Sequence, residues 1–181
     1  MIYTAMTKSA LKLMYKQHEG QVDRAGIPYV FHPFHLAERM DDEISTTVAL
    51  LHDVVEDTDM TFDRLKEYGY PSVVIDALKC LTHDPKVDYF DYVKNIGTNP
   101  IATKVKIADL EHNSDLSRLK KVTDKDLQRV EKYSICIQYL KSLNFAFNES
   151  VSRSEIDAMF QEKKWMIIDF VLSNLLLKVR N

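Results

Sequence analysis

Helical periodicity runs through most of this chain, and residues that break helices interrupt it only at widely spaced points. The 181 residues include four glycines and five prolines. No segment shows the strict apolar–polar alternation that is typical of a half-buried strand. We therefore predict an all-α fold, a helical bundle. Because no repeat or low-complexity linker divides the sequence, we expect one domain over residues 1–181, with a core at about 7–145 and a helical extension at about 150–181.

Capping residues and stop signals predict where the helices begin and end. The segment from Glu43 to about Asp57 follows a possible cap at Asp42 and is apolar on several faces, so we expect it to be the central helix. The other predicted helices are Thr7–Glu19, Pro33–Met40, Thr61 to Gly69, Pro71 to about Thr82, Asn99 to about Leu110, Thr123 to about Asn144, one that begins at Ser154 with Asp157 as its capping partner, and Lys163–Val179.

Composition and charge narrow the classes of partner. A hydrophobic share of 45%, a charged share of 28% and a formal net charge of −3 are ordinary for a globular domain and leave no basic stripe for a nucleic-acid backbone. Cys80 and Cys136 stand apart in apolar segments, so we interpret them as core thiols of a reducing compartment. We expect a cytoplasmic protein with no membrane span and no nucleic-acid partner, and either a monomer or a homodimer.

The segment from Val48 to Asp57 contains four ionisable side chains among leucines and valines. Burying such charges unpaired costs several kcal/mol each, so something must compensate them. Helix positions three and four apart share a face, which places His52 and Asp53 close to Glu56 and Asp57. The four groups can therefore converge on one cavity.

A second polar cluster and a third element extend this group. Asp109 and Asn113 lie four residues apart on another predicted helix, and His32 follows a loop that contains two glycines. Imidazole nitrogens together with carboxylate oxygens, without a thiolate, suit manganese, iron or zinc better than calcium. The pattern therefore indicates a site for a divalent metal ion.

Several ordered motifs resemble the HD superfamily of metal-dependent phosphohydrolases, and within it the hydrolase domain of the Rel/SpoT proteins and their small stand-alone relatives. The resemblance covers about Tyr15 to Leu119. The motifs are His18-Glu-Gly-Gln21, Gly26-Ile-Pro28-Tyr29-Val-Phe-His32-Pro33, Ala49-Leu-Leu-His52-Asp53-Val-Val-Glu56-Asp57-Thr58, Leu81-Thr82 and Lys106-Ile-Ala-Asp109-Leu-Glu-His112-Asn113.

The resemblance implies a role for each matching residue. One divalent ion, manganese in the Rel/SpoT branch and otherwise iron, cobalt or zinc, would be held by the ligands His32, His52, Asp53 and Asp109. Glu56 and Asp57 would orient and deprotonate the attacking water, and Asn113 would contact a substrate phosphate. The implied reaction is hydrolysis of the 3′-diphosphate of (p)ppGpp, a small nucleotide, to GDP or GTP and pyrophosphate.

One departure from the Rel/SpoT pattern concerns the substrate. Where that pattern places the arginine that would stack on guanine, this chain has Asp23 followed by Arg24, which is our candidate for the substrate contact. The carboxylate of Asp23 would repel a polyphosphate beside it unless it interacts with another group. Two alternatives therefore stay open: a phosphohydrolase of another (deoxy)nucleotide, and a module that senses a nucleotide without cleaving it.

Each candidate residue also has a plain structural interpretation. His52 and Asp53 can be a polar pair near a surface, and His32 an ordinary loop histidine. Asp109 and Asn113 can be a polar pair at a helix end. The other histidines, His18, His35, His83 and His112, are more often packing or surface residues than ligands.

Overall fold

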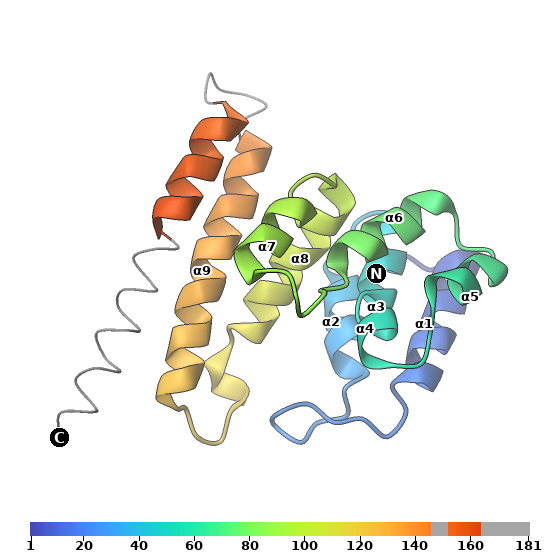
Figure 1. Ribbon diagram of the computed structural model, residues 1–181. Coiled ribbons are helices and arrows are strands. Elements are labelled where there is room, and N and C mark those ends of the chain that lie inside the picture. The colour runs from blue at the N-terminus through green and yellow to red at the C-terminus, as the bar shows by residue number, and fades with distance from the viewer. Residues whose placement is uncertain (146–151, 164–181) are drawn as a thin grey trace.

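The described part of the chain, residues 1–145 and 152–163 of a computed structural model, is built from helices (Figure 1), with one isolated antiparallel bridge between Val22 and Pro28. The prediction of an all-α fold is confirmed. Residues 153–163 are helical. The named elements are α1 (Ala5–Gln17), α2 (Phe31–Glu38), α3 (Glu43–Leu51), α4 (Val54–Asp57), α5 (Phe62–Glu67), α6 (Ser72–Leu81), α7 (Tyr89–Ile96), α8 (Pro100–Asn113), the 3-10 helix η1 (Leu116–Arg118) and α9 (Asp124–Phe145).

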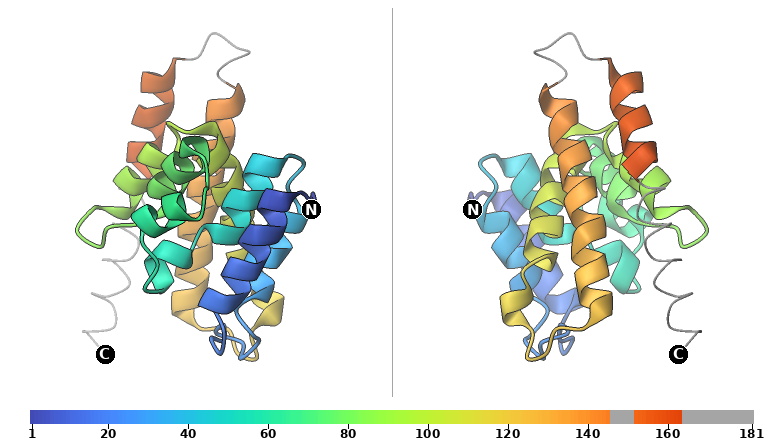
Figure 2. Two further views of the ribbon diagram at one scale, coloured as in Figure 1. Left: turned by 90° about the vertical axis from the view of Figure 1, so that its right-hand side faces the viewer. Right: turned by 90° about the vertical axis from the view of Figure 1, so that its left-hand side faces the viewer.

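Helix α3 is the centre of the fold. It contacts α1, α2, α6 and α8, and every residue from Ser45 to Leu51 is buried. Its apolar residues cover several faces, as predicted, and its two threonines satisfy their hydroxyls within the helix: Thr46 donates to the carbonyl of Asp42 at 2.7 Å and Thr47 to that of Glu43 at 2.8 Å. Each leucine buried here contributes roughly 1.5–3 kcal/mol. Figures 1 and 2 show α1, α2 and α6 beside this element, with α9 farther away on the other side of α8.

Capping explains most helix starts. The carboxylate of Asp42 accepts the backbone N–H of Ser45 at 2.7 Å, and Thr61 caps α5 as predicted. The predicted capping pair at α9 is present, because Thr123 and Asp126 bond each other's backbone N–H groups. The pair predicted at Ser154 and Asp157 is wrong: Ser152 and Glu155 fill these roles two residues earlier.

The predicted helix from Glu43 to Asp57 is interrupted at His52 and Asp53. Helix α3 ends at Leu51, and the short α4 begins at Val54. At the end of α3 the ring Nδ1 of His52 lies 2.9 Å from the carbonyl of Ala49, one of the oxygens that lose their helical partner there. The interruption thus presents His52 and Asp53 at the junction of two helices.

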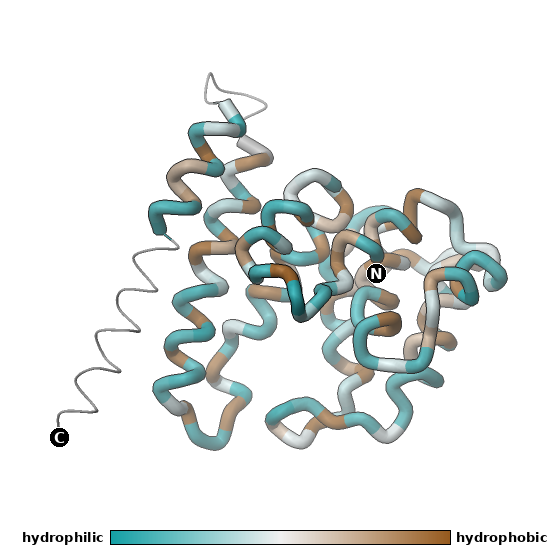
Figure 3. The backbone as a smooth tube through the Cα atoms, viewed as in Figure 1, coloured by the Kyte–Doolittle hydropathy of each residue, from teal (hydrophilic) through white to brown (hydrophobic). Residues whose placement is uncertain are grey.

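The α8–α9 pair and residues 153–163 form one side of the molecule (Figure 1). Hydrophilic and hydrophobic residues alternate along α9 (Figure 3). Phe160 stacks on Tyr139 with ring centroids 4.0 Å apart and meets Phe90 of α7 at 5.2 Å. The prediction of a last helix at Lys163–Val179 falls almost entirely outside the described residues.

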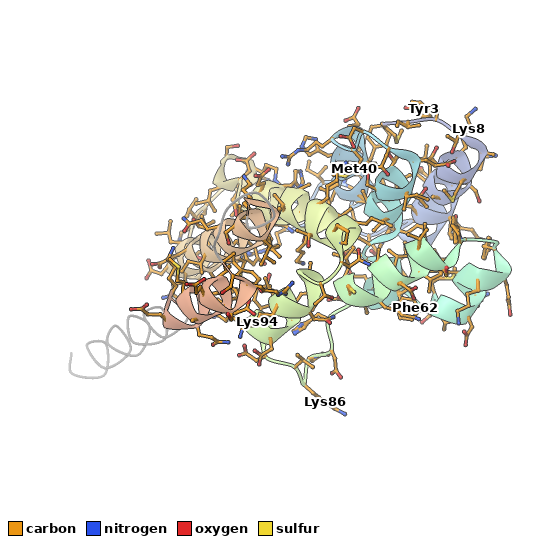
Figure 4. All side chains as sticks on the ribbon, turned by 90° about the horizontal axis from the view of Figure 1, so that it is seen from above. Tyr3, Lys8, Met40, Phe62, Lys86 and Lys94 are labelled. Carbon is orange, nitrogen blue, oxygen red and sulfur yellow. The ribbon has the colours of Figure 1, made fainter. Side chains whose placement is uncertain are left out.

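Helix α7 was not among the predicted elements. The loop that joins α6 to α7 carries Lys86 at its outer edge (Figure 4), and Asp88 caps the new helix by accepting the N–H of Phe90 at 3.0 Å. Within residues 1–145 and 152–163, we find no helix with both the length and the apolar character that crossing a membrane requires.

The cap of α3 gives a test of stability. Partial burial raises the pKa of Asp42, but the hydrogen bonds from Ser45 and the ammonium of Lys104 outweigh this effect and lower the pKa to about 2. Asp42→Ala should therefore destabilise the fold by about 1 kcal/mol at neutral pH. Because the folded pKa is depressed, this contribution is present above the ordinary aspartate pKa of about 3.9 and is lost as the pH falls towards 2.

Urea unfolding at several pH values measures this difference, with the exposed Asp59→Ala as the matched control. Equal stability of Asp42→Ala and the parent chain at neutral pH would contradict the capping role.

Candidate active site

Three segments that lie far apart in the sequence bring two histidines and two aspartates together beside α3. His32 comes from α2, His52 and Asp53 follow α3, and Asp109 comes from α8. Ligand atoms of His32, His52 and Asp109 lie within 4.8 Å of one another. Asp53 Oδ2 lies 2.8 Å from His52 Nε2 and 3.8 Å from His32 Nε2. The structure therefore places all four predicted metal ligands in one cluster.

The cluster is suited to a cation. His32, His52 and Asp109 are buried, and His52 Nε2 faces the Asp53 carboxylate at 2.8 Å without the alignment of a regular hydrogen bond. The Ala49 carbonyl fixes the other ring nitrogen of His52 as the donor, so that in the neutral ring Nε2 carries the lone pair. Two imidazoles and two carboxylates are a donor set that first-row divalent ions accept. The residues present thus fit a divalent metal ion.

Electrostatics inside the cluster show that its carboxylates require positive charge beside them. Burial disfavours the charged imidazole of His52, but the carboxylates of Asp53 and Asp109 outweigh it and raise its pKa to about 9. Burial also disfavours the charged form of Asp53, but His52 lowers its pKa to about 2. The Asp53 carboxylate is therefore ionised at neutral pH and attracts positive charge.

Neighbouring side chains orient these groups. The hydroxyl of Tyr29 donates to Asp53 Oδ2. Lys106, on the same helix as Asp109, holds Asp109 Oδ2 at 2.9 Å and keeps the pKa of that carboxyl well below its ordinary value against the effect of burial. Asn113 donates to Asp109 Oδ1 at 2.6 Å. Both oxygens of Asp109 are thus fixed in direction.

Two further histidines lie close to the cluster. His112 Nδ1 meets His32 Nδ1 at 2.7 Å, so one ring donates to the other. His18 is buried, bonds Gln21 at 2.8 Å and packs beside the tilted ring of Tyr29 with centroids 5.0 Å apart. The contacts of His18 agree with its interpretation as a packing residue, whereas that interpretation is incomplete for His112, which contacts a candidate ligand directly.

The two candidate bases, Glu56 and Asp57, lie on α4, immediately after the cluster. Both are partly exposed to solvent, and burial raises the pKa of each carboxyl above its ordinary value. Glu56 Oε2 accepts the backbone N–H of His83 at 2.9 Å. The α6–α7 loop therefore holds the carboxylate that would receive a proton.

A cavity of about 400 Å³ adjoins the cluster, between the α1–α2 loop and the α8–α9 connection. Tyr29 and Asn113 line it and touch the aspartates of the cluster. Three arginines, Arg24, Arg118 and Arg129, also line it, together with the aromatic ring of Tyr133. An arginine-lined cavity beside a site for a cation can bind a phosphorylated, planar molecule.

The two substrate-contact candidates both reach this cavity. Asn113 lies between it and Asp109, whereas Arg24 is 63% exposed and forms an ion pair with Asp126 at 2.9 Å. Asp23 bears on other groups: its Oδ1 accepts the N–H groups of Ala25 and Ile27, and its Oδ2 lies 3.5 Å from Arg118.

Sequence reasoning assigned no role to four residues around the site: Tyr29, Lys106, Arg118 and Arg129. Lys106 had a usable signal, since a lysine three residues before an aspartate on a helix shares its face. Arg118 and Arg129 lie beyond the last matching motif, and their approach to the cavity depends on how α9 folds back along α8 (Figure 1).

No family model matches the chain. A guanosine-3′,5′-bis(diphosphate) 3′-pyrophosphohydrolase, MESH1, of Danio rerio is 29% identical over 171 residues, which cover 83% of this chain and 92% of that protein. A protein of the same enzymatic name from Haemophilus influenzae is 36% identical over 111 residues, 53% of this chain. The chain spans only 16% of the Haemophilus protein and 7% of a chloroplastic protein of Oryza sativa named as a GTP diphosphokinase.

The fold has a counterpart among solved structures. A structure reported as a metazoan ortholog of SpoT that hydrolyzes ppGpp matches with a TM-score of 0.65 and 22% sequence identity, over 90% of this chain and 98% of that one. In fold this chain is thus like the SpoT ortholog, and in sequence it is similar to proteins named guanosine-3′,5′-bis(diphosphate) 3′-pyrophosphohydrolases.

Proposed function

We propose that this protein is a metal-dependent phosphohydrolase that removes the 3′-diphosphate of (p)ppGpp as pyrophosphate and leaves GDP or GTP. The observation that carries the proposal is the convergence of His32, His52 and Asp109, with Asp53 beside them, next to an arginine-lined cavity whose residues Tyr29 and Asn113 touch the two aspartates. Similarity to proteins named for this reaction over most of the chain supports the same substrate.

In the proposed reaction, His32, His52, Asp53 and Asp109 hold one divalent ion, for which we propose manganese, with iron, cobalt or zinc as alternatives. When bound, the ion supplies positive charge that polarises a phosphoryl oxygen and acidifies water. Glu56 and Asp57 orient the attacking water and take its proton, a role for which carboxyls of raised pKa are suited.

The substrate contacts and the supporting residues complete the proposal. Asn113 contacts the phosphate at the cluster, and Arg24 contacts the nucleotide from the rim of the cavity. Lys106 and Tyr29 keep the two aspartates in place. Water attacks the phosphorus, the 3′-oxygen leaves with the nucleoside, and pyrophosphate is released, so no covalent intermediate with the protein is required.

We also propose that residues 1–181 act as one domain, in which residues 7–145 form the catalytic core, and that the protein works in the cytoplasm as a monomer or homodimer without a nucleic-acid partner. Free thiols at Cys80 and Cys136 support a reducing compartment.

Incubation of the manganese-loaded protein with ppGpp should release pyrophosphate and GDP in equal amounts, which chromatography of the nucleotides measures. A parallel panel contains deoxynucleoside mono- and triphosphates. If the protein hydrolyses a deoxynucleotide of the panel but not ppGpp, that deoxynucleotide replaces ppGpp as the proposed substrate. If the protein binds nucleotides but hydrolyses none of them with manganese, iron or cobalt, the result favours a nucleotide-sensing module.

Removal of a ligand tests the metal site. His52→Ala and Asp109→Asn should each weaken manganese binding by more than about 100-fold, since even the partners that orient ligands are worth 10–100-fold. Isothermal titration calorimetry measures the affinity. His35→Gln, an exposed histidine on α2, is the matched control and should bind as the parent does. Unchanged affinity in His52→Ala would refute the assignment.

Glu56→Gln tests the proton-accepting role. The substitution keeps the size of the side chain but removes the basic carboxylate, so kcat should fall by about 10²–10⁴ while manganese affinity stays the same. Glu67→Gln, at the end of α5, serves as the control. If Glu56→Gln retains full kcat, another group accepts the proton.

A further inference from the structure

The three arginines of the cavity differ in how fully their charges are neutralised. Arg24 Nη1 and Arg129 Nη1 each lie 2.9 Å from Oδ1 of the buried Asp126. Arg118 Nη1 lies 3.5 Å from Asp23 Oδ2, a longer and weaker contact. Its Nε is buried and has no hydrogen-bond partner within the described part of the chain. Arg118 therefore keeps unused donors at the cavity wall.

Asp23 holds this arginine from a rigid position. Its Oδ1 accepts the N–H groups of Ala25 at 2.8 Å and Ile27 at 2.9 Å, which closes the loop around Gly26, whose φ of 81° favours glycine. The second oxygen is left to face Arg118. The acidic residue in the α1–α2 loop is thus paired with a cation across the cavity instead of standing alone beside a phosphate.

Arg118 is also linked to the candidate metal ligands. Its Nη1 lies 3.3 Å from His112 Nε2, and His112 Nδ1 lies 2.7 Å from His32 Nδ1. If His32 uses Nε2 as a ligand, its proton is on Nδ1 and donates to His112, which must then carry its own proton on Nε2. The N–H groups of His112 Nε2 and Arg118 Nη1 then face each other and cannot form a hydrogen bond. Of the two contacts of Arg118 Nη1, the one with Asp23 therefore remains.

We propose that Arg118 is a specificity-determining residue that binds a second, 5′-phosphorylated end of the nucleotide while its 3′-diphosphate lies at the His–Asp cluster, and that Asp23 is its positioning residue. This rests on the proposed function for the placement of the 3′ end. A guanidinium can bind a phosphate through two parallel hydrogen bonds, which the terminal nitrogens of Arg118 at the cavity wall can supply. Phosphate binding would replace the weak contact with Asp23.

The experiment measures binding of GDP, which carries the 5′-diphosphate, and of guanosine, which lacks it, to the manganese-loaded full chain by calorimetry. Arg118→Gln should weaken GDP binding by about 10–100-fold and leave guanosine binding unchanged. Arg118→Lys should recover part of the loss, because the charge remains. Arg64→Gln on α5 is the matched control and should bind GDP as the parent does.

Asp23→Asn completes a double-mutant cycle. It keeps an oxygen that can accept the loop N–H groups but removes the competing charge, so GDP should bind more tightly, and the gain should shrink when Arg118 is glutamine. Hydrolysis of ppGpp by Arg118→Gln should show a raised KM with kcat little changed.

Equal GDP affinity of Arg118→Gln and the parent chain overturns the inference, as does an equal loss of GDP and guanosine binding, which would indicate a merely structural role. If the parent chain binds GDP through Arg118 but does not hydrolyse ppGpp, the proposed function fails while the 5′-phosphate contact stands. If ppGpp is hydrolysed with the same KM by both chains, the contact alone is wrong.

Discussion

The structure depends on one electrostatic constraint: imidazoles and carboxylates are held together inside an apolar helical core. Helix α3 is buried along most of its length and ends where His52 and Asp53 meet His32 and Asp109. Burial of such groups is costly unless opposite charge is close by. Lys106 and the hydrogen bonds from Tyr29 and Asn113 supply part of that compensation, and the cation of the proposed reaction would supply the rest.

In the proposed reaction, three parts of this site would have different roles. The buried cluster would hold positive charge, the partly exposed carboxyls of α4 would accept a proton, and the arginine-lined cavity would hold the nucleotide. The cluster is buried, the carboxyls of α4 are partly exposed and the cavity is open to solvent. The helix junction at His52 and Asp53 connects the cluster to α4. The interruption between α3 and α4 is therefore a feature of the site as much as of the fold.

Helix content could be predicted from the sequence because it depends on local patterns, whereas the full set of four candidate ligands was predicted from the resemblance of ordered motifs to a known family. The apolar stripe of α3, the cap at Asp42 and the spacing of Asp109 and Asn113 are readable along the chain. The break after Leu51 was missed because no glycine or proline marks it: His52 keeps helical backbone angles, and Asp53, with φ of −101° and ψ of −3°, departs from them. Arg118 and Arg129 reach the cavity only through long-range packing, and the pairing of Asp23 with Arg118 spans 95 residues.

The central claim is that four side chains from three segments share one divalent ion. Diffraction from crystals grown with manganese, recorded at the manganese absorption edge, tests it most directly. We expect one anomalous peak within bonding distance of His32 Nε2, His52 Nε2, Asp53 and Asp109. Ordered crystals with no peak there, or with these side chains turned away from one another, would contradict it.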